Sequence, residues 1–365
     1  MEKQKLRYLA EFCIRTGINW TELANQIKVS EVSIRHCYEE TFDEVYIEDF
    51  VKMILLDSVF IIELFLRRRE KHYFNRNFKD DFKLGKSTRE YGVLGDLILV
   101  ENQLPYSVLE DLYEFSIRKA NEEGYPPFYE LVLFNLDDYL CPPKIRENKN
   151  HKCTCNCFSC LYCFWISRCF CCLRDGDQSA KKEDEEGGLN QEKPINFTDL
   201  ARKSRSFKLP VSRNDNTVMK VYNATMLREA GVKFKASSEA WLIDMKFERG
   251  VLKMLRFLAN DDTERVIRNL MAFEQCYHPN EPLICDYIWI LDFLINTEKD
   301  VDLLVEKGII VNLLGDSKTA TNLVNNLGLE IRAYGSCFYG LNNHYDSPGC
   351  RTVAIMRNVC FSNLW

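Results

Sequence analysis

The feature that most constrains this chain is a stretch of regular apolar periodicity from residue 223 to residue 331, without a low-complexity break. Its first segment, 222–230, reads as a short helix. Gly231 follows at the position where helices commonly end in the left-handed conformation. This stretch therefore predicts a packed core of several short elements.

In the next segment, apolar and charged residues alternate with a period of two. Val232 and Phe234 alternate with lysines, and apolar residues alternate with charged ones over 243–248. Alternation of this kind puts one face of a strand on a core and the other in water. We therefore predict two strands joined through residues 237–239, and we expect them to form a small antiparallel element.

After Gly250 the sequence again contains residues that typically begin and end helices. Asp261 and Asp262 are expected to cap a helix, and Thr297-x-x-Asp300 resembles a capping box. The predicted helices cover residues 263–277, 283–296, 298–307 and 317–326. The expected fold is mainly α with a small antiparallel β element (α+β), formed as one α-rich globular domain.

The first 143 residues also read as helical. Two amphipathic helices are predicted in the first forty residues, and Thr41-x-x-Glu44 is expected to cap a helix that ends near Arg69. Residues 51–66 are apolar on every side, which is typical of a fully buried helix. Asp57 and Glu63 interrupt this run about 120° apart around the helix, at about 100° per residue, so they do not share a face. We interpret Asp57 as a buried structural carboxylate.

A polar triplet, Glu101-Asn102-Gln103, follows the strand-like run 97–100, and Pro105 is expected to begin a helix that ends near residue 119. The triplet could form a binding site. The alternative is a network that satisfies backbone groups where a strand becomes a helix, and we favour it.

Residues 144–217 differ in composition and are predicted to be an insertion or linker that is largely disordered. Half of the sixteen cysteines lie between Cys153 and Cys172. Three interpretations are open: a zinc site, reversible acylation, or a disordered loop. The zinc candidates are Cys157, Cys160, Cys163 and Cys169, with His151 as a further ligand, and the acylation candidates are Cys171 and Cys172.

Composition excludes some classes of protein. The net charge is −6 with 28% charged residues, whereas a nucleic-acid-binding domain normally carries a basic surface. No apolar run reaches the roughly 18 residues of a membrane-spanning helix, and the first residues do not form a signal peptide. The scattered cysteines fit buried thiols in a reducing compartment.

Motifs of catalysis are also missing from the sequence. There is neither G-x-S-x-G nor H-E-x-x-H, and the glycines near Lys318 fit a phosphate-binding loop poorly. We expect no catalytic residues, no cofactor and no metal beyond the weak cysteine candidates. The alternative is an enzyme whose site is assembled from dispersed carboxylates, with Asp57, Glu101 and Glu274 as first candidates.

Several ordered blocks resemble the plant family called domain of unknown function 247. They are residues 53–64, 96–105, 224–234, 268–275, 300–304 and 307–310. The signature positions with expected structural roles are Asp57, Glu101, Asn102, Gln103, Pro105, Arg228, Glu229, Gly231, Asn269, Glu274, Gln275 and Gly308.

The resemblance implies a division of the chain and a class of function. Residues 1–143 and 218–334 are expected to be the two halves of the family domain, and 335–365 a tail. Relatives are expected to carry a C-terminal transmembrane anchor at the plasma membrane. We expect this chain to be truncated at both ends, and by itself cytoplasmic or peripheral.

We therefore predict a non-enzymatic interaction or recognition protein that binds an unknown protein partner and no nucleic acid. Some grass relatives look like self-incompatibility determinants, and we transfer only the class. The remaining alternative is a truncated copy without function.

Overall fold

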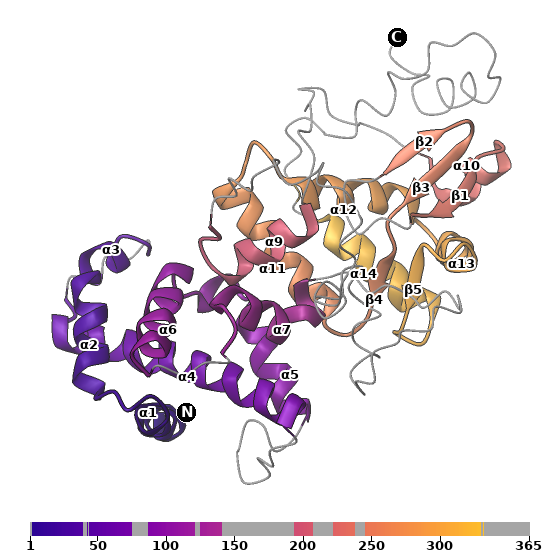
Figure 1. Cartoon of the computed structure of the whole chain (residues 1–365). Helices are drawn as coiled ribbons and strands as arrows, with labels where there is room; N and C mark the ends of the chain where they lie inside the picture. Colours follow the sequence, from indigo (N-terminus) through magenta and orange to yellow (C-terminus); the bar gives the residue numbers. More distant parts are fainter. Residues whose placement is uncertain are drawn as a thin grey trace, which may run out of the picture.

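The computed structural model of the chain describes residues 2–38, 42, 44–74, 87–120, 125–140, 193–206, 222–237, 245–329 and 331. Within them the fold is mainly α-helical with a small β element, as predicted. Two helical halves lie next to each other along the molecule and meet where α7, α9 and α11 pack (Figure 1).

The elements of the amino-terminal half are α1 (Glu2–Thr16), α2 (Trp20–Val29), α3 (Glu31–Arg35), α4 (Ile47–Phe74), α5 (Ser87–Asp96), the 3₁₀ helix η1 (Val100–Asn102), α6 (Tyr106–Ala120) and α7 (Phe128–Leu140).

The carboxyl-terminal half contains α9 (Phe197–Ser206), α10 (Ala224–Glu229), β1 (Lys233–Ala236), β2 (Lys246–Glu248), β3 (Val251–Met254), β4 (Phe257–Ala259), α11 (Thr263–Tyr277), α12 (Leu283–Leu294), α13 (Glu298–Glu306), β5 (Ile310–Asn312) and α14 (Ser317–Gly328).

Helix α4 is the centre of the amino-terminal half. Nearly all of its side chains from Phe50 to Leu66 are buried, as the apolar run predicts. Helices α1, α2, α6 and α7 pack around it. Burying one large apolar side chain contributes about 1.5–3 kcal/mol relative to leaving it exposed, so α4 fixes the positions of its neighbours.

The predicted start of this helix was wrong, because α4 begins at Ile47. The preceding turn has a positive φ of 53° at Phe42. Arg35 holds this turn by donating hydrogen bonds to the carbonyl oxygens of Phe42 and Val45, the latter at 2.9 Å. These contacts hold Phe42 and Val45 in the turn, outside the helix.

The strand-like run 97–100 is not a strand either. It forms a turn that leads into η1. The side-chain amide of Gln103 donates hydrogen bonds to the carbonyl oxygens of Leu97 at 2.9 Å and Leu99 at 2.6 Å. The backbone is thus satisfied by a side chain rather than by a second strand.

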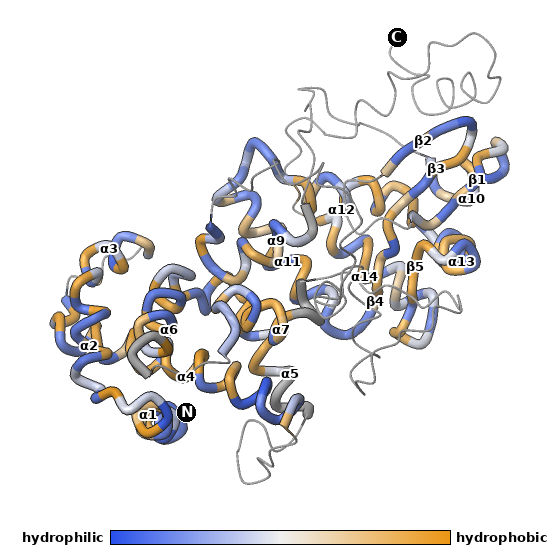
Figure 2. The backbone as a smooth tube through the Cα atoms, viewed as in Figure 1, coloured by the Kyte–Doolittle hydropathy of each residue, from blue (hydrophilic) through white to orange (hydrophobic). Residues whose placement is uncertain are grey.

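The small sheets correct the expected strand orientation. The sheet order is β1-β3-β2: β1 pairs parallel to β3, with Phe234 opposite Leu252, and only β2 and β3 are antiparallel. Strands β4 and β5 form a second, parallel pair. The sequence did not predict β3, β4 or β5. Figure 2 shows β2 as largely hydrophilic at the end of the molecule, in keeping with its exposed Lys246 and Glu248.

The predicted helices of the carboxyl-terminal half are confirmed as α10 to α14. Gly231 has a φ of +95° after α10, and Gly308 has a φ of +68° after α13. The carboxylate of Asp300 accepts a hydrogen bond from the backbone N–H of Thr297 at 2.9 Å, which is the predicted capping contact. Local sequence therefore determines these helix ends.

Helix α9 requires a correction. It lies inside the range 144–217 that the sequence assigned to a disordered insertion, yet Phe197, Leu200 and Ala201 are buried in the core. It packs against α7, α11 and α12. The helix is short and mostly polar. Its single apolar face is buried only when the neighbouring helices pack against it. The cysteines 153–172 lie outside the described residues.

Candidate functional site

The most developed polar constellation lies where the two halves meet. Backbone and side-chain hydrogen bonds there join three segments that are far apart in the sequence: residues 97–103, helix α9 and helix α11. We call this cluster the polar junction, and define it as Gln103, Asn196, Asp199, Arg202, Asn269 and Glu274.

Two side chains of α9's own sequence fix its amino terminus. The side-chain oxygen of Asn196 accepts a hydrogen bond from the backbone N–H of Asp199 at 2.8 Å. The carboxylate of Asp199 accepts one from the N–H of Ile195 at 3.0 Å. This arrangement resembles a capping box, except that Asp199 accepts from the residue before the cap, Ile195, instead of from Asn196 itself. The N–H group of Asp199, in the first turn of α9, is satisfied in this way.

Gln103 adds a contact from the other half of the molecule. Its side-chain oxygen accepts hydrogen bonds from the backbone N–H of Phe197 at 3.0 Å and of Thr198 at 3.4 Å. Its side-chain nitrogen holds the turn at 97–99 at the same time. One amide therefore connects two segments nearly a hundred residues apart.

Glu274 anchors the other side of the junction and is completely buried. One carboxylate oxygen accepts a hydrogen bond from Nε of Arg202 at 3.2 Å. The other accepts the backbone N–H groups of Ile284 at 2.9 Å and Cys285 at 3.1 Å, in the first turn of α12. Glu274 thus caps α12 and pairs with α9 through one functional group.

Burial dominates the electrostatics of Glu274. Removal from water raises the pKa of its carboxyl to about 7, although the Arg202 charge and the two backbone N–H groups oppose this rise. Arg202 is satisfied further by the carbonyl oxygen of Glu281 at 2.9 Å. Glu274 has no exposed surface, and its contacts hold α9 and α12 against α11.

Asn269 completes the junction on the side of η1. Its side-chain oxygen accepts the backbone N–H of Val100 at 3.0 Å, and its nitrogen donates to the carbonyl oxygen of Arg265 at 2.8 Å. The family-signature residues Gln103, Asn269 and Glu274 therefore lie in one structural network. This agrees with the interpretation of the triplet at 101–103 as a backbone-satisfying network.

A second buried network lies in the amino-terminal half. Glu63 is fully buried on α4 and pairs with Arg15 of α1 at 2.9 Å and with Arg67 at 2.8 Å. Arg15 also contacts Glu70, and Arg67 contacts Glu11. These ion pairs attach α1 to α4.

The three carboxylates of the enzyme alternative have separate surroundings. Asp57 is half-buried and pairs with Lys5 of α1, rather than being fully buried as expected. Glu101 is exposed on η1. Glu274 is inside the polar junction. None of the three lines the small pocket described below.

The other signature residues have different positions. Arg228 and Glu229 are exposed at the end of α10, and Gln275 is half-buried on α11. Asn102 is exposed and donates to the carbonyl oxygen of Asp96 at 3.2 Å. Pro105 is buried immediately before α6, whose predicted start is confirmed.

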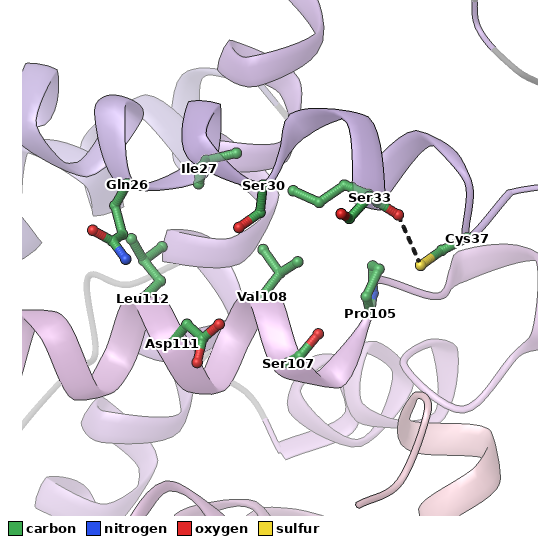
Figure 3. A pocket seen from close by; sticks show the side chains of 11 residues that line it. Gln26, Ile27, Ser30, Ser33, Cys37, Pro105, Ser107, Val108, Asp111 and Leu112 are labelled. Carbon is green, nitrogen blue, oxygen red and sulfur yellow. Dashed lines mark hydrogen bonds between the residues drawn. The ribbon is translucent and has the colours of Figure 1, made fainter.

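A small pocket of about 140 Å³ lies between α2, α3 and the first turns of α6 (Figure 3). Ser30 and Gln26 face Asp111 and Ser107 across it, and the thiol of Cys37 donates to the carbonyl oxygen of Ser33 at 3.3 Å. Pockets for organic ligands usually occupy about 300–1,000 Å³. This one has space for a few water molecules.

Potential metal ligands do not gather in the described part of the chain, where no three histidine, cysteine or acidic side chains come together. The zinc candidates Cys157, Cys160, Cys163 and Cys169 and the acylation candidates Cys171 and Cys172 lie outside the described residues. Those predictions stay predictions.

Sequence reasoning missed Asn196, Asp199 and Arg202. The signal that could have found them is the tetrapeptide 196–199, Asn-Phe-Thr-Asp, which has the spacing of a capping box in front of an amphipathic segment. Its partners could not have been read from the sequence, because they are 72 residues or more away, as in the pair of Arg202 with Glu274.

The fold and the polar junction together define a mainly α-helical domain. Segments that are far apart in its sequence are joined by contacts of buried carboxylate and amide groups. The chain belongs to the plant family DUF247, described as plant proteins of unknown function, whose profile matches residues 1–365.

Two curated relatives come from Arabidopsis thaliana. A putative UPF0481 protein is 22% identical over 402 aligned positions, covering 91% of this chain and 72% of the relative. A second UPF0481 protein is 23% identical, covering 82% of this chain and 58% of the relative. No solved structure matches the chain. Among the described helices, none is both long and apolar enough to cross a bilayer.

Proposed function

We propose that this chain is a non-enzymatic interaction protein, which uses the exposed apolar side chains of its amino-terminal helices to bind a protein partner. The observation that carries the proposal is the uneven distribution of exposed large apolar residues. Among the described residues, eight of seventeen lie between residues 6 and 53: Leu6, Ile14, Trp20, Val29, Val32, Tyr46, Ile47 and Met53.

The degree of exposure strengthens this argument. Ile14 on α1 is 82% exposed, and Val29 at the end of α2 is 85% exposed. Single exposed apolar residues are common, but a concentration of them is typical of surfaces that bind other proteins. Leu6 and Ile14 also share the exposed face of α1 with Ala10, opposite the buried Tyr8 and Phe12.

The buried carboxylates support the same proposal by their contacts. Glu63 and Glu274 are held by arginines and, for Glu274, by backbone N–H groups in positions without exposed surface. A catalytic acid or base needs to reach its substrate within hydrogen-bond distance. We therefore assign these residues to stability rather than to chemistry.

Membrane association belongs to this proposal only through the family resemblance. We propose that full-length relatives act at the plasma membrane and that a recognition role is exercised there. Centrifugation of the chain with and without added lipid vesicles tests the membrane association directly, because a membrane-bound chain leaves the soluble fraction. Recovery of the chain in the soluble fraction in both cases would limit the proposal to protein binding.

The main experiment is capture of partners from plant extract with purified chain. The variant Leu6→Ser/Ile14→Ser/Val29→Ser should lose the specific partners that the wild type retains. A matched control, Met226→Ser/Val305→Ser/Leu313→Ser, changes three exposed apolar residues of the carboxyl-terminal half. It should retain them.

Both variants should unfold at the temperature of the wild type, because all six residues are exposed. Equal capture by the two variants would contradict the proposed surface. Conversion of any metabolite by wild-type protein, lost in Glu101→Gln, would favour the enzyme instead.

A further inference from the structure

The small pocket between α2, α3 and α6 has an apolar floor and a polar rim (Figure 3). The floor consists of side chains that are buried in the core: Ile27, Ile34, Val108 and Leu112. The rim consists of half-buried and exposed polar side chains: Gln26, Ser30, Ser33, Ser107 and Asp111. A ligand that matches both parts has an apolar body and a polar end.

The size of the pocket limits what can enter it. Its volume is about 140 Å³. An apolar cavity of about 150 Å³ holds one benzene ring, whereas pockets for organic ligands begin at about 300 Å³. The pocket therefore has space for one amino-acid side chain that a partner inserts from the surface.

The charges around the pocket favour a cation. Of the described residues that line it, only Asp111 is charged. Asp111 has no ion-pair partner in the part of the chain that the structure describes, while its neighbour Glu110 accepts a hydrogen bond from Lys193 at 2.6 Å. Glu22 lies four residues before Gln26 on α2, and Glu114 lies three residues after Asp111 on α6, so both continue the helix faces that line the pocket.

A lysine side chain has the shape and charge that these features require. Its four-carbon stem can cover apolar surface while its charged end stays in water. The ammonium group is compact and has three hydrogen-bond donors, whereas the guanidinium of arginine is a wider, planar fork. Acceptors for an ammonium are available on both sides of the pocket, where Ser30 faces Ser107 and Asp111 (Figure 3).

We propose that this pocket binds one lysine side chain of a protein partner, with the stem on Ile27 and Val108 and the ammonium at Asp111. The exposed Val29 and Val32 directly precede Ser30 and Ser33 and belong to the surface proposed above. The inference rests on the proposed function, because it names the kind of side chain that this surface recognises. The chain's net charge of −6 favours the approach of a basic partner.

The test uses the purified full chain, with isoleucine methyl groups labelled for NMR, and short peptides with one central residue between glycines. The central residue is lysine, arginine or norleucine, which keeps the four-carbon stem and lacks the ammonium. The methyl signals of Ile27 and Ile34 report binding in the pocket, and that of Ile288 in α12 is the reference. We expect the lysine peptide to bind about threefold more tightly than the norleucine peptide, because an exposed ion pair contributes modestly, and added salt should reduce this preference.

Two variants locate the site. Asp111→Asn removes the charge and keeps the shape, so the lysine peptide should bind only as tightly as the norleucine peptide. Ser30→Leu should weaken the binding of every peptide, because the larger side chain occupies the pocket; the Ser30 side chain makes no capping hydrogen bond to α3, so the fold should be retained. Asp261→Asn removes an exposed carboxylate of the other half and is the matched control, in which the preference for lysine should persist.

Equal binding of the lysine and norleucine peptides to wild type would overturn the site, as would a preference for lysine that persists in Asp111→Asn. Tighter binding of the arginine peptide would overturn the assignment to lysine. Binding without a shift of the Ile27 and Ile34 signals would overturn the location. Partner capture through residues 6, 14 and 29 is measured with separate variants, so failure of the proposed function can be told from failure of this site.

Discussion

Glu63 and Glu274 are both fully buried, and their negative charges are compensated in different ways. Glu63 is neutralised from the side by Arg15 and Arg67, which are themselves held by further carboxylates. Glu274 has one arginine, Arg202, and two backbone N–H donors at the start of α12. The first network joins helices along their sides, and the second joins a helix side to a helix end.

This difference determines how much stability each half loses when its buried glutamate is removed. In the amino-terminal network, each arginine has a second carboxylate to which it can turn. In the polar junction, loss of Glu274 leaves two backbone N–H groups without their acceptor and leaves the buried Arg202 with contacts to the exposed Glu281. Buried charges without partners are among the most destabilising defects in a protein. The two halves should therefore differ in sensitivity although their glutamates are equally buried.

Glu274→Ala should have the largest effect, a loss of about 3–5 kcal/mol of unfolding free energy, since it removes the buried charge partner of Arg202 and leaves two N–H groups of α12 without an acceptor. Urea denaturation monitored by circular dichroism measures it. Glu274→Gln keeps an acceptor for the N–H groups of α12 and should lose less. A loss below about 1 kcal/mol in the alanine variant would mean that the junction does not hold the halves together.

Glu63→Ala should be the next most damaging, at about 2–3 kcal/mol, because Arg15 and Arg67 retain Glu70 and Glu11 as partners. The same urea titration applies. If this variant proves less stable than Glu274→Ala, the contrast between the two glutamate sites is incorrect.

Gln103→Ala should destabilise the chain by about 1–2 kcal/mol through loss of the cap on α9 and of the turn at 97–99. Hydrogen exchange of the amides of Phe197 and Thr198 should accelerate more than that of α4. Uniform acceleration in both helices would show that Gln103 has no local role at the junction.

Asp300 should make the stability of the carboxyl-terminal half sensitive to acid. Burial raises the pKa of its carboxyl, but hydrogen bonds from Thr225 and Thr297 outweigh this and hold the pKa below its usual value of 3.8. A lowered pKa stabilises the folded state above 3.8, and this contribution disappears as the pH falls through the folded value. The stability difference between wild type and Asp300→Asn should therefore shrink below pH 3.8. A constant difference from pH 7 to pH 2 would exclude this linkage.

Glu101→Ala should have the smallest effect, within about 0.5 kcal/mol, because the side chain is exposed on η1. Thermal unfolding checks this. A substantial loss of stability would place Glu101 in the polar junction, and loss of an activity with stability intact would support the enzyme alternative.

The sequence predicted elements best where the signal is local. Gly231 and Gly308 were predicted to end helices and have the positive φ values that this requires. The apolar run of α4 was predicted to be buried all round, and from Phe50 to Leu66 every residue is buried except Lys52, Met53 and Asp57. The helix start near Thr41 and the strand near Leu97 were wrong, because the side chains of Arg35 and Gln103, four to ten residues away, bind the backbone there in turns.

By itself the sequence determined the mainly α-helical class, the family and most helix ends of the carboxyl-terminal half, since capping and periodicity act over a few residues. Only the tertiary structure decided that α9 belongs to the core, that β3 lies between β1 and β2, and that Arg202 faces Glu274. Those facts depend on contacts between residues far apart in the chain. Such contacts contribute free energy only when the intervening segments have folded.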